Sequence, residues 1–205
     1  MRSGHVIYKV DDLDQAVKEW RDKGFVVEYG RTENPINALI YFSEGAYIEL
    51  LQTTGMPKII QLIAKFFKPK NLEKFLYWEN CPEGWCAFCI EKDCGDLEKE
   101  IAYLKENKID GFYLKKGKRE DTHGRTLNYK CFFTQGLDFP FLMSYFDVDP
   151  KPKDFVHPNG KRKIGHIKYY ISAKYYDILR KLIDDDSLEI IKDNQRAGTF
   201  EISID

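Results

Sequence analysis

Two stretches of the sequence each hold a histidine that is followed, further along, by a carboxylate in a strand-like segment. The first pair is His5 and Glu49, and the second is His166 and Glu201. An imidazole nitrogen and a carboxylate oxygen together suit several divalent metal ions. A carboxylate can also take or return a proton next to a carbonyl group. These residue types therefore indicate metal binding or proton transfer.

Other polar side chains have the chemistry to bind or orient a small molecule. The guanidinium of Arg119, in a polar turn, can clamp the oxygens of a carboxylate or a carbonyl group. Asn37 and Tyr129 supply hydrogen-bond donors. Lys9 has the strand parity of His5, so it is expected to face the same side. Each of these residues also has an ordinary interpretation. Arg119 can lie in a solvated loop and Asn37 can anchor a turn. Tyr129 can pack in the core, and Lys9 can reach solvent at a strand end.

The five cysteines do not indicate a disulfide framework or a zinc site. Their number is odd and the chain begins without an apolar signal segment, which favours a cytoplasmic protein with reduced thiols. Cys86 and Cys89 have the spacing of a zinc pair, but they lie in a predicted strand, whereas a zinc pair needs a turn. Cys131 has no histidine base that the sequence identifies. We expect most of these thiols to be buried.

The elements that position these residues follow one pattern near the N-terminus. Asp11 and Asp12 precede apolar residues that are spaced as on one face of a helix, and Gly24 can end that helix in a left-handed conformation. Apolar and β-branched runs on both sides of the helix predict strands. The strands are expected at residues 5–10, 25–29, 38–42 and 47–52. The first unit is therefore βαβββ.

The same order recurs later in the chain. A glycine followed by histidine or tryptophan opens an apolar run at residues 4, 84 and 165, and this nearly constant interval indicates repeated supersecondary units. The second unit is predicted to have a helix at 96–107 and strands at 85–90, 111–114, 126–134 and 139–146. The third is a partial copy, with a helix at 174–183 and strands at 165–169, 188–191 and 199–204.

Residues 57–78, between the first two units, do not follow the repeat. Apolar residues lie among lysines and Pro69 interrupts the run, which predicts two short helices. One interpretation is a basic amphipathic surface for a membrane, for a partner or for a second copy of the chain in a homodimer. The other is a connector whose apolar face covers the open end of the core.

The bulk composition narrows the class of partner. The 205 residues are 43 % hydrophobic, which supports a substantial core. The chain has 32 basic and 33 acidic residues, so its net charge of −1 gives no general attraction to nucleic acid. No apolar run approaches the roughly 20 residues of a membrane span. The 15 % aromatic content suits a pocket for a flat or partly apolar small molecule.

Several short motifs, taken in order, point to one known family. They are Gly4-His5-Val6, Asp12-Leu13, Gly24-Phe25, Asn37-Ala38-Leu39-Ile40, Tyr47-Ile48-Glu49-Leu50, Arg119 to Tyr129, Pro140-Phe141 and His157-Pro158-Asn159-Gly160. In order and spacing they resemble the vicinal oxygen chelate superfamily, and within it the glyoxalase-like domain proteins. The resemblance covers most of residues 4–170.

The resemblance implies an α+β fold in which tandem βαβββ modules form a cupped mixed sheet, with a partial third βα-β module at the C-terminus. The expected units are a first module at 1–55, a helical connector at 56–80, a second module at 81–150 and the partial third module at 151–205. All four are expected to pack as one globular unit.

In that superfamily two modules form a cavity that commonly holds a divalent metal between residues of their first and last strands. The resemblance implies His5 and Glu49 as the ligands from the first module. In the second module Trp85 takes the place of the histidine, and Met143 or Ser144 stands near the expected carboxylate. That ligand set is incomplete, so a cavity without a metal is the leading hypothesis.

A complete metal site requires a different arrangement of the units. If the third copy cups against the first, His166 and Glu201 can join His5 and Glu49 in a site of two histidines and two carboxylates.

The resemblance implies one of two functions. In the first, the protein is an isomerase or lyase in which Glu49 exchanges a proton next to a carbonyl group, and His5 or a metal stabilises the enolate. Arg119 and Asn37 then anchor the substrate. In the second, the protein binds and sequesters a small molecule without catalysis, as drug-resistance members of the superfamily do, and the missing ligands cost it nothing.

Overall fold

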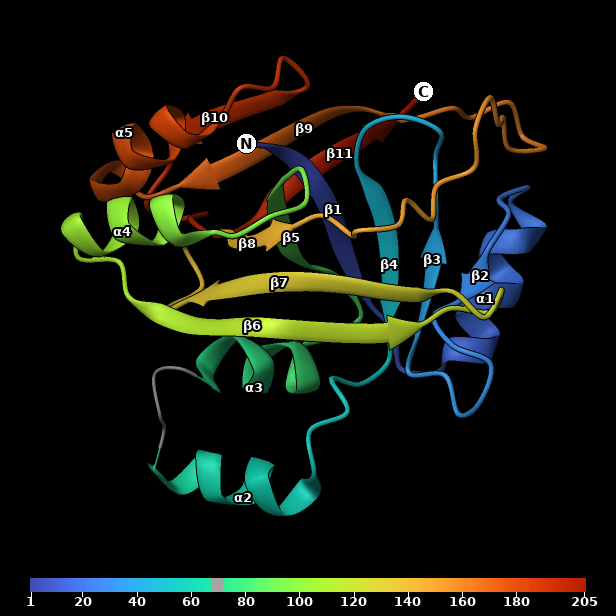
Figure 1. Cartoon of the computed structure of the whole chain (residues 1–205), viewed down its shortest axis with the longest axis horizontal. Coiled ribbons are helices and arrows are strands. Elements are labelled where there is room, and N and C mark those ends of the chain that lie inside the picture. Colours follow the sequence, from blue (N-terminus) through green and yellow to red (C-terminus); the bar gives the residue numbers. More distant parts are fainter. Residues whose placement is uncertain (68–71) are drawn as a thin grey trace.

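The secondary structure of the computed structural model follows the three predicted units (Figure 1). The structure describes residues 1–67 and 72–205, without the side chains of residues 63–67. The first unit contains β1 (Arg2–Lys9), α1 (Leu13–Asp22), β2 (Glu28–Tyr29), β3 (Asn37–Ile40) and β4 (Tyr47–Leu51). The second contains β5 (Gly84–Lys92), α4 (Glu98–Glu106), β6 (Gly111–Glu120), β7 (Thr126–Thr134) and β8 (Phe141–Ser144). The third contains β9 (Ile164–Ile171), α5 (Ala173–Leu182), β10 (Leu188–Lys192) and β11 (Phe200–Ile204).

The first two units share one curled sheet of eight strands, in the order β2-β3-β4-β1-β5-β8-β7-β6. The opening strands β1 and β5 pair antiparallel near its centre. Each opening strand also pairs in parallel with the last strand of its own unit, β1 with β4 and β5 with β8. The third unit forms a separate sheet in the order β10-β9-β11. The predicted α+β class, the cupped sheet and the partial third module are therefore confirmed.

Helix α1 begins and ends at residues that suit helix ends. The Asp12 carboxylate accepts a hydrogen bond from the backbone N–H of Gln15 at 3.0 Å, which satisfies one of the free donors of the first turn. Gly24 follows the helix with a φ of +80°, a conformation that glycine adopts without a steric penalty. The buried side chains of the helix are Leu13, Ala16 and Val17.

Strand alternation divides the buried side chains between the two faces of the large sheet. On the convex face, Val6 and Phe88 pack with side chains of α1, α4 and the sheet of the third unit. On the concave face, Ile7 and Cys89 pack with Trp78 of the connector. The concave face is therefore left to the first two units and the connector, and this is where a cavity can form.

Trp85 does not face the concave side, although the sequence places it in the position of the second-module histidine. Its ring packs against Tyr8 at 4.9 Å and Phe200 at 6.0 Å on the convex side. The pairing of β1 with β5 shifts by one residue between Ile7 and Tyr8, so Tyr8 pairs with Trp85 and Cys86 is the extra residue. Because of this bulge, the residues before Cys86 face the side of the sheet opposite to the one that regular alternation gives them.

Strand β2 is shorter than the predicted strand at residues 25–29. The Phe25 N–H donates to the carbonyl of Trp20 at the end of α1, and the Val26 N–H donates to Nδ1 of His157 at 3.0 Å. These backbone groups are therefore used by the helix end and by the later linker, not by a sheet ladder. His157, in the linker before the third unit, is buried, and its hydrogen bond holds that linker against the first unit.

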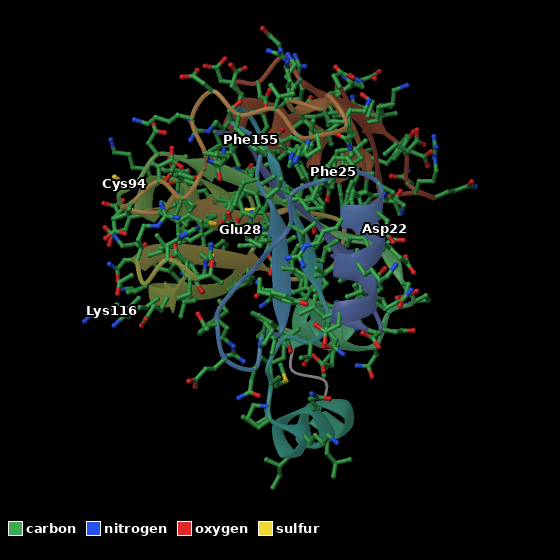
Figure 2. The ribbon with its side chains drawn as sticks, turned by 90° about the vertical axis from the view of Figure 1, so that its right-hand side faces the viewer. Asp22, Phe25, Glu28, Cys94, Lys116 and Phe155 are labelled. Carbon is green, nitrogen blue, oxygen red and sulfur yellow. The ribbon has the colours of Figure 1, made fainter. Side chains whose placement is uncertain are left out.

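The connector contains the two expected helices, α2 (Lys58–Phe67) and α3 (Glu73–Asn80). Helix α3 lies against the concave side of the sheet and buries Trp78, whereas α2 lies away from the sheet in both views (Figures 1 and 2). Ile59 and Leu62 of α2 are 68 % and 58 % exposed. Pro69, on which the two-helix prediction partly depends, lies outside the described residues.

All five cysteines are free, and four of them are buried. The exception is Cys94, which lies at the edge of the molecule in the view of Figure 2. Within the described residues, no helix is long and apolar enough to cross a membrane.

Candidate functional site

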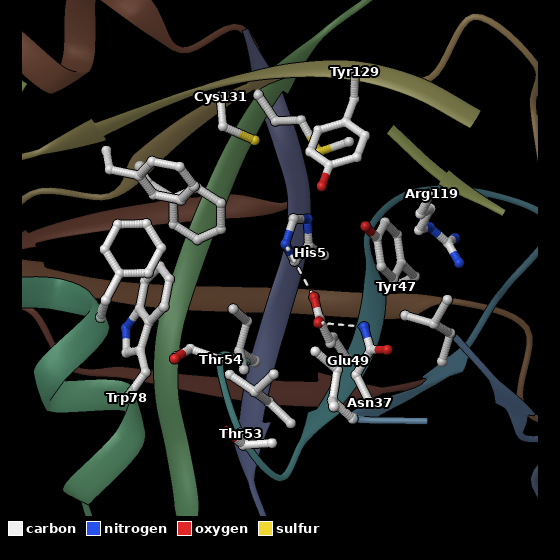
Figure 3. A pocket seen from close by; sticks show the side chains of 18 of the residues that line it. His5, Asn37, Tyr47, Glu49, Thr53, Thr54, Trp78, Arg119, Tyr129 and Cys131 are labelled. Atoms are coloured by element: carbon white, nitrogen blue, oxygen red, sulfur yellow. Dashed lines mark hydrogen bonds and ion pairs between the residues drawn. The ribbon is translucent and has the colours of Figure 1, made fainter. Parts of the chain in front are cut away.

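A cavity of about 240 Å³ opens on the concave face of the large sheet, between the first two units (Figure 3). Its walls come from β1, β3 and β4 of the first unit and from β6, β7 and β8 of the second. Helix α3 and the segment after β4 close one end, through Phe75, Trp78, Thr53 and Thr54. The sequence-based candidates His5, Asn37, Glu49, Arg119 and Tyr129 all line this cavity.

His5 and Glu49 face one another on neighbouring strands. Their register places Tyr47 beside His5 and Glu49 beside Ile7, and the Nε2 atom of His5 lies 3.7 Å from Oε2 of Glu49. The other Glu49 oxygen accepts a hydrogen bond from Nδ2 of Asn37 at 2.7 Å. Asn37 therefore holds one oxygen of the carboxylate, while the other remains open to the cavity and to His5.

Burial sets the charge of His5. Its side chain is 5 % exposed, and burial, with the positive charges of Lys151 and Arg119, lowers its pKa to about 3. The imidazole is therefore neutral near pH 7. Its ring stacks on Tyr47 at 4.7 Å and meets the edge of Phe141 at 5.3 Å, so its orientation is fixed by packing. Its Nδ1 atom is buried and has no hydrogen-bond partner among the described residues.

Burial shifts the pKa of Glu49 upward, in the opposite direction to the pKa of His5. It raises the pKa of the carboxyl group above its usual value, despite the hydrogen bond from Asn37 and the charge of Arg119, which both lower it. Glu49 is thus a stronger base than a solvated glutamate, and its side chain is still 15 % exposed. A carboxylate in this state can accept a proton from carbon and return it.

Arg119 is fixed at the rim of the cavity. One terminal nitrogen donates to the carbonyl of Gly30 at 3.1 Å, the other donates to the hydroxyl of Tyr41, and the guanidinium lies 5.1 Å from the centre of the Phe146 ring. No carboxylate forms an ion pair with Arg119 among the described residues. Its charge is therefore available to an anion or a carbonyl oxygen in the cavity.

The hydroxyl of Tyr129 points into the cavity on the side of His5 (Figure 3). Burial raises the pKa of Tyr129 to about 12, so the hydroxyl stays protonated near neutral pH and can donate a hydrogen bond.

The end of the cavity near α3 is aromatic. Phe75 lies 4.6 Å and Trp78 lies 6.0 Å from the ring of Phe133, and Trp78 lies 5.3 Å from Phe141. Strand alternation gives no sign that Phe75 and Trp78 belong to this site, because they come from the connector. Their only sequence signal is the expectation that the connector covers the open end of the core.

Three of the other candidates lie away from the cavity. The ammonium of Lys9 donates to the carbonyls of Val10 and Gln52 at the strand ends, and Lys9 does not line the cavity. His166 pairs instead with Glu189 at 3.1 Å, and Glu201 accepts from the hydroxyl of Tyr170 at 2.7 Å.

The site of two histidines and two carboxylates therefore does not form. The reason is the placement of the third unit, whose sheet packs on the convex face of the large sheet, opposite His5 and Glu49.

The donor set of the cavity does not fit a divalent metal ion. His5 and Glu49 of the first unit supply two metal-donor side chains. On the opposite wall, the second unit has Phe141, Met143 and Cys131. Burial raises the pKa of the Cys131 thiol, which disfavours the thiolate that a metal needs. Among the described residues, no group of three histidine, cysteine, aspartate or glutamate side chains is placed to hold a metal ion.

The curled sheet of two paired βαβββ units, with a polar pair at the bottom of the cup, defines a class of protein. Residues 4–176 match the family model of the glyoxalase-like domain. The chain belongs to the glyoxalase-like domain family, as the resemblance of its motifs predicted.

Several solved structures are similar to this chain at low sequence identity. A hypothetical protein from Staphylococcus aureus is 14 % identical, with 94 % of this chain and 86 % of that chain covered and a TM-score of 0.61. A methylmalonyl-CoA epimerase in complex with methylmalonyl-CoA and NH4+ is 17 % identical, with 74 % and 98 % covered and a TM-score of 0.45. A methylmalonyl-CoA epimerase of Streptomyces coelicolor is 16 % identical, with 71 % and 97 % covered and a TM-score of 0.45. No curated protein gives a significant match to the sequence.

Proposed function

We propose that this protein binds a small carbonyl compound in the cup and that Glu49 exchanges a proton at the carbon next to the carbonyl group. The observation that carries this proposal is the buried Glu49 carboxylate, with its raised pKa, one oxygen held by Asn37 and the other 3.7 Å from a neutral imidazole. This chemistry is that of an isomerase or a lyase.

The side chains of the site supply both the base and the hydrogen-bond donors that the proposed step needs. Glu49 takes the proton as the carbon–hydrogen bond breaks, and the electron pair moves onto the carbonyl oxygen to give an enolate. The Tyr129 hydroxyl and the Arg119 guanidinium are donors for that oxygen. Return of the proton to carbon gives an isomerase, and loss of a leaving group from the next carbon gives a lyase.

The walls of the cavity suggest how such a substrate lies. A flat or apolar group suits the aromatic end formed by Phe75, Trp78, Phe133 and Phe141. An anionic or carbonyl group suits Arg119 at the rim. The carbon that loses a proton then lies between these ends, next to Glu49.

A second function is binding and sequestration without catalysis. The apolar lining from the second unit, Phe141 and Met143, favours it because these residues contribute to binding but to no step of a reaction. In that case Glu49 serves only to bind the ligand.

Deuterium exchange separates the two functions. The protein is incubated in D2O with a panel of 2-oxo acids and acyl thioesters, and deuterium uptake next to the carbonyl is followed by NMR. We expect wild-type protein to accelerate uptake for at least one compound and Glu49→Gln to reduce the rate by about 10²- to 10⁴-fold. Glu44→Gln, at an exposed glutamate, is the matched control and is expected to keep the wild-type rate. Binding without exchange in the wild-type protein would support sequestration.

A further inference from the structure

A second cavity, of about 100 Å³, lies between α3, the start of β5, the segment before β8 and the third unit. Its lining includes Lys74 and Tyr77 of α3, Tyr169 of β9 and Ala197 in the turn before β11. It is distinct from the first cavity, and the side chains of Trp78 and Phe141 line both.

Among the described residues that line this cavity, Lys74 is the one lysine, and it is buried, with 6 % of its surface exposed. Its ammonium group donates to the carbonyl of Gly136 at 2.7 Å and to the carbonyl of Phe139 at 2.8 Å. An ammonium group carries three N–H donors, so one remains after these two hydrogen bonds. Both acceptors are neutral.

Within the part of the chain that the structure describes, the charge of Lys74 has no close counter-ion. No ion pair among the described residues includes Lys74. Burial lowers its pKa to about 7, and the more distant charges of Glu73 and Asp138 offset this only in part. A buried charge without a partner is costly, and an anion beside it recovers much of that cost.

We propose that this second cavity binds a small monocarboxylate with a short apolar chain, whose carboxylate accepts a charge-assisted hydrogen bond from Lys74. The volume has room for a few water molecules or for a compact ligand of that kind. Phe88, Phe139 and Tyr169 supply apolar walls for the chain. A phosphate ion fits these walls poorly, because it offers no apolar surface to them.

Binding of an anion and anchoring of the segment before β8 place different requirements on the surroundings of Lys74. Anchoring uses the two hydrogen bonds to Gly136 and Phe139 and needs no cavity. Binding of an anion additionally requires the space on the side of Ala197 to remain open. A variant that fills this space while Lys74 stays in place therefore tests the site itself.

Butyrate and butyramide are suitable probes, because they have nearly the same shape and differ in charge. Binding is followed by NMR chemical-shift titration at about pH 6, below the pKa of Lys74, so that both partners are charged. We expect butyrate to bind at least tenfold more tightly than butyramide, and Lys74→Met to remove this difference. Ala197→Leu is expected to weaken butyrate binding with the folded spectrum retained. Lys99→Met, at an exposed lysine outside both cavities, is the matched control and is expected to leave butyrate affinity unchanged.

The lysine side chain gives a second readout that does not depend on whether Lys74→Met folds. With lysine labelled by 13C, saturating butyrate is expected to raise the midpoint of the Lys74 titration. Equal affinity for butyrate and butyramide, or butyrate affinity unchanged by Ala197→Leu, would overturn the proposal. An unmoved Lys74 midpoint at saturating butyrate would also overturn it.

Discussion

At the scale of single residues, burial in the cup gives His5 and Glu49 different tasks. It keeps the imidazole neutral and makes the carboxylate more basic. A neutral His5 does not hold Glu49 in a charged ion pair, although the two side chains are 3.7 Å apart. The proton of the site is therefore expected to move on and off Glu49.

The Asn37→Ala substitution tests how Asn37 tunes that carboxylate. The hydrogen bond from Asn37 lowers the pKa of Glu49, so its removal is expected to raise that pKa further. Because the base must be deprotonated, activity rises with pH through this pKa. The acid limb of the rate of deuterium exchange is expected to move to higher pH by the same amount. A limb that stays in place would show that Glu49 is not the titrating base.

The pH dependence of stability tests the buried state of His5. The folded pKa of about 3 is below the value of about 6.5 for an unfolded histidine, so the unfolded state binds more protons between these values. The stability contributed by the neutral imidazole is complete above about pH 6.5. It is lost as the pH falls through 3, by a total on the order of 5 kcal/mol.

Urea unfolding of wild-type protein and His5→Gln at several pH values measures this effect. The free energy of unfolding of the wild type is expected to fall more steeply than that of the variant between about pH 6.5 and pH 4. Glu49 acts in the opposite sense, since its raised pKa makes the folded state bind more protons. It is present in both proteins, so the comparison isolates His5. Parallel curves would contradict the assignment.

At the scale of elements, helix α3 determines the shape of the cup. Trp78 is 5 % exposed and separates the two cavities. Trp78→Ala is expected to lower the free energy of unfolding by about 3–5 kcal/mol, because it leaves a large void in an aromatic cluster. It is also expected to weaken binding of flat ligands. Urea unfolding measures the first effect.

A substitution in α2 provides the matched comparison. Ile59 is 68 % exposed, so Ile59→Ser is expected to change the stability by no more than about 0.5 kcal/mol. A loss from Ile59→Ser as large as that from Trp78→Ala would contradict the packing described for the two connector helices.

Elements with strong local signals could be predicted from the sequence, and those set by distant contacts could not. Strand β7 spans residues 126–134 as predicted, because its apolar run is bounded by turn residues. The strand at 25–29 is reduced to Glu28–Tyr29 because His157, far along the chain, takes the Val26 N–H. The bulge that turns Trp85 to the convex face has no sequence signal, since it depends on the register between two strands.

At the scale of the whole molecule, repetition of the sequence predicts what each unit is but not the face on which it packs. The paired units and the partial third unit followed from the recurring motifs, and the cup followed from the family resemblance. The parts of the site on opposite walls, such as Glu49 and Arg119, were accessible only through the family resemblance. The sequence could not show that His166 and Glu201 lie far from His5. Both faces of the large sheet can accept an apolar layer, and the third unit packs on the convex one.

The position of the third unit gives a prediction for His166. It pairs with Glu189 on an exposed surface, and such pairs contribute little to stability. His166→Ala is expected to change the free energy of unfolding by less than about 1 kcal/mol and to leave the rate of deuterium exchange unchanged. A large loss of activity in this variant would place the third unit in the site.

The most direct test of the account is an NMR titration of the Glu49 carboxyl carbon, assigned by its loss in Glu49→Gln. We expect a midpoint above the usual value of about 4.3 for glutamate, since burial in the cup outweighs the hydrogen bond from Asn37. A midpoint at or below the usual value would mean that Glu49 is an ordinary solvated carboxylate, and would contradict its assignment as the base of the site.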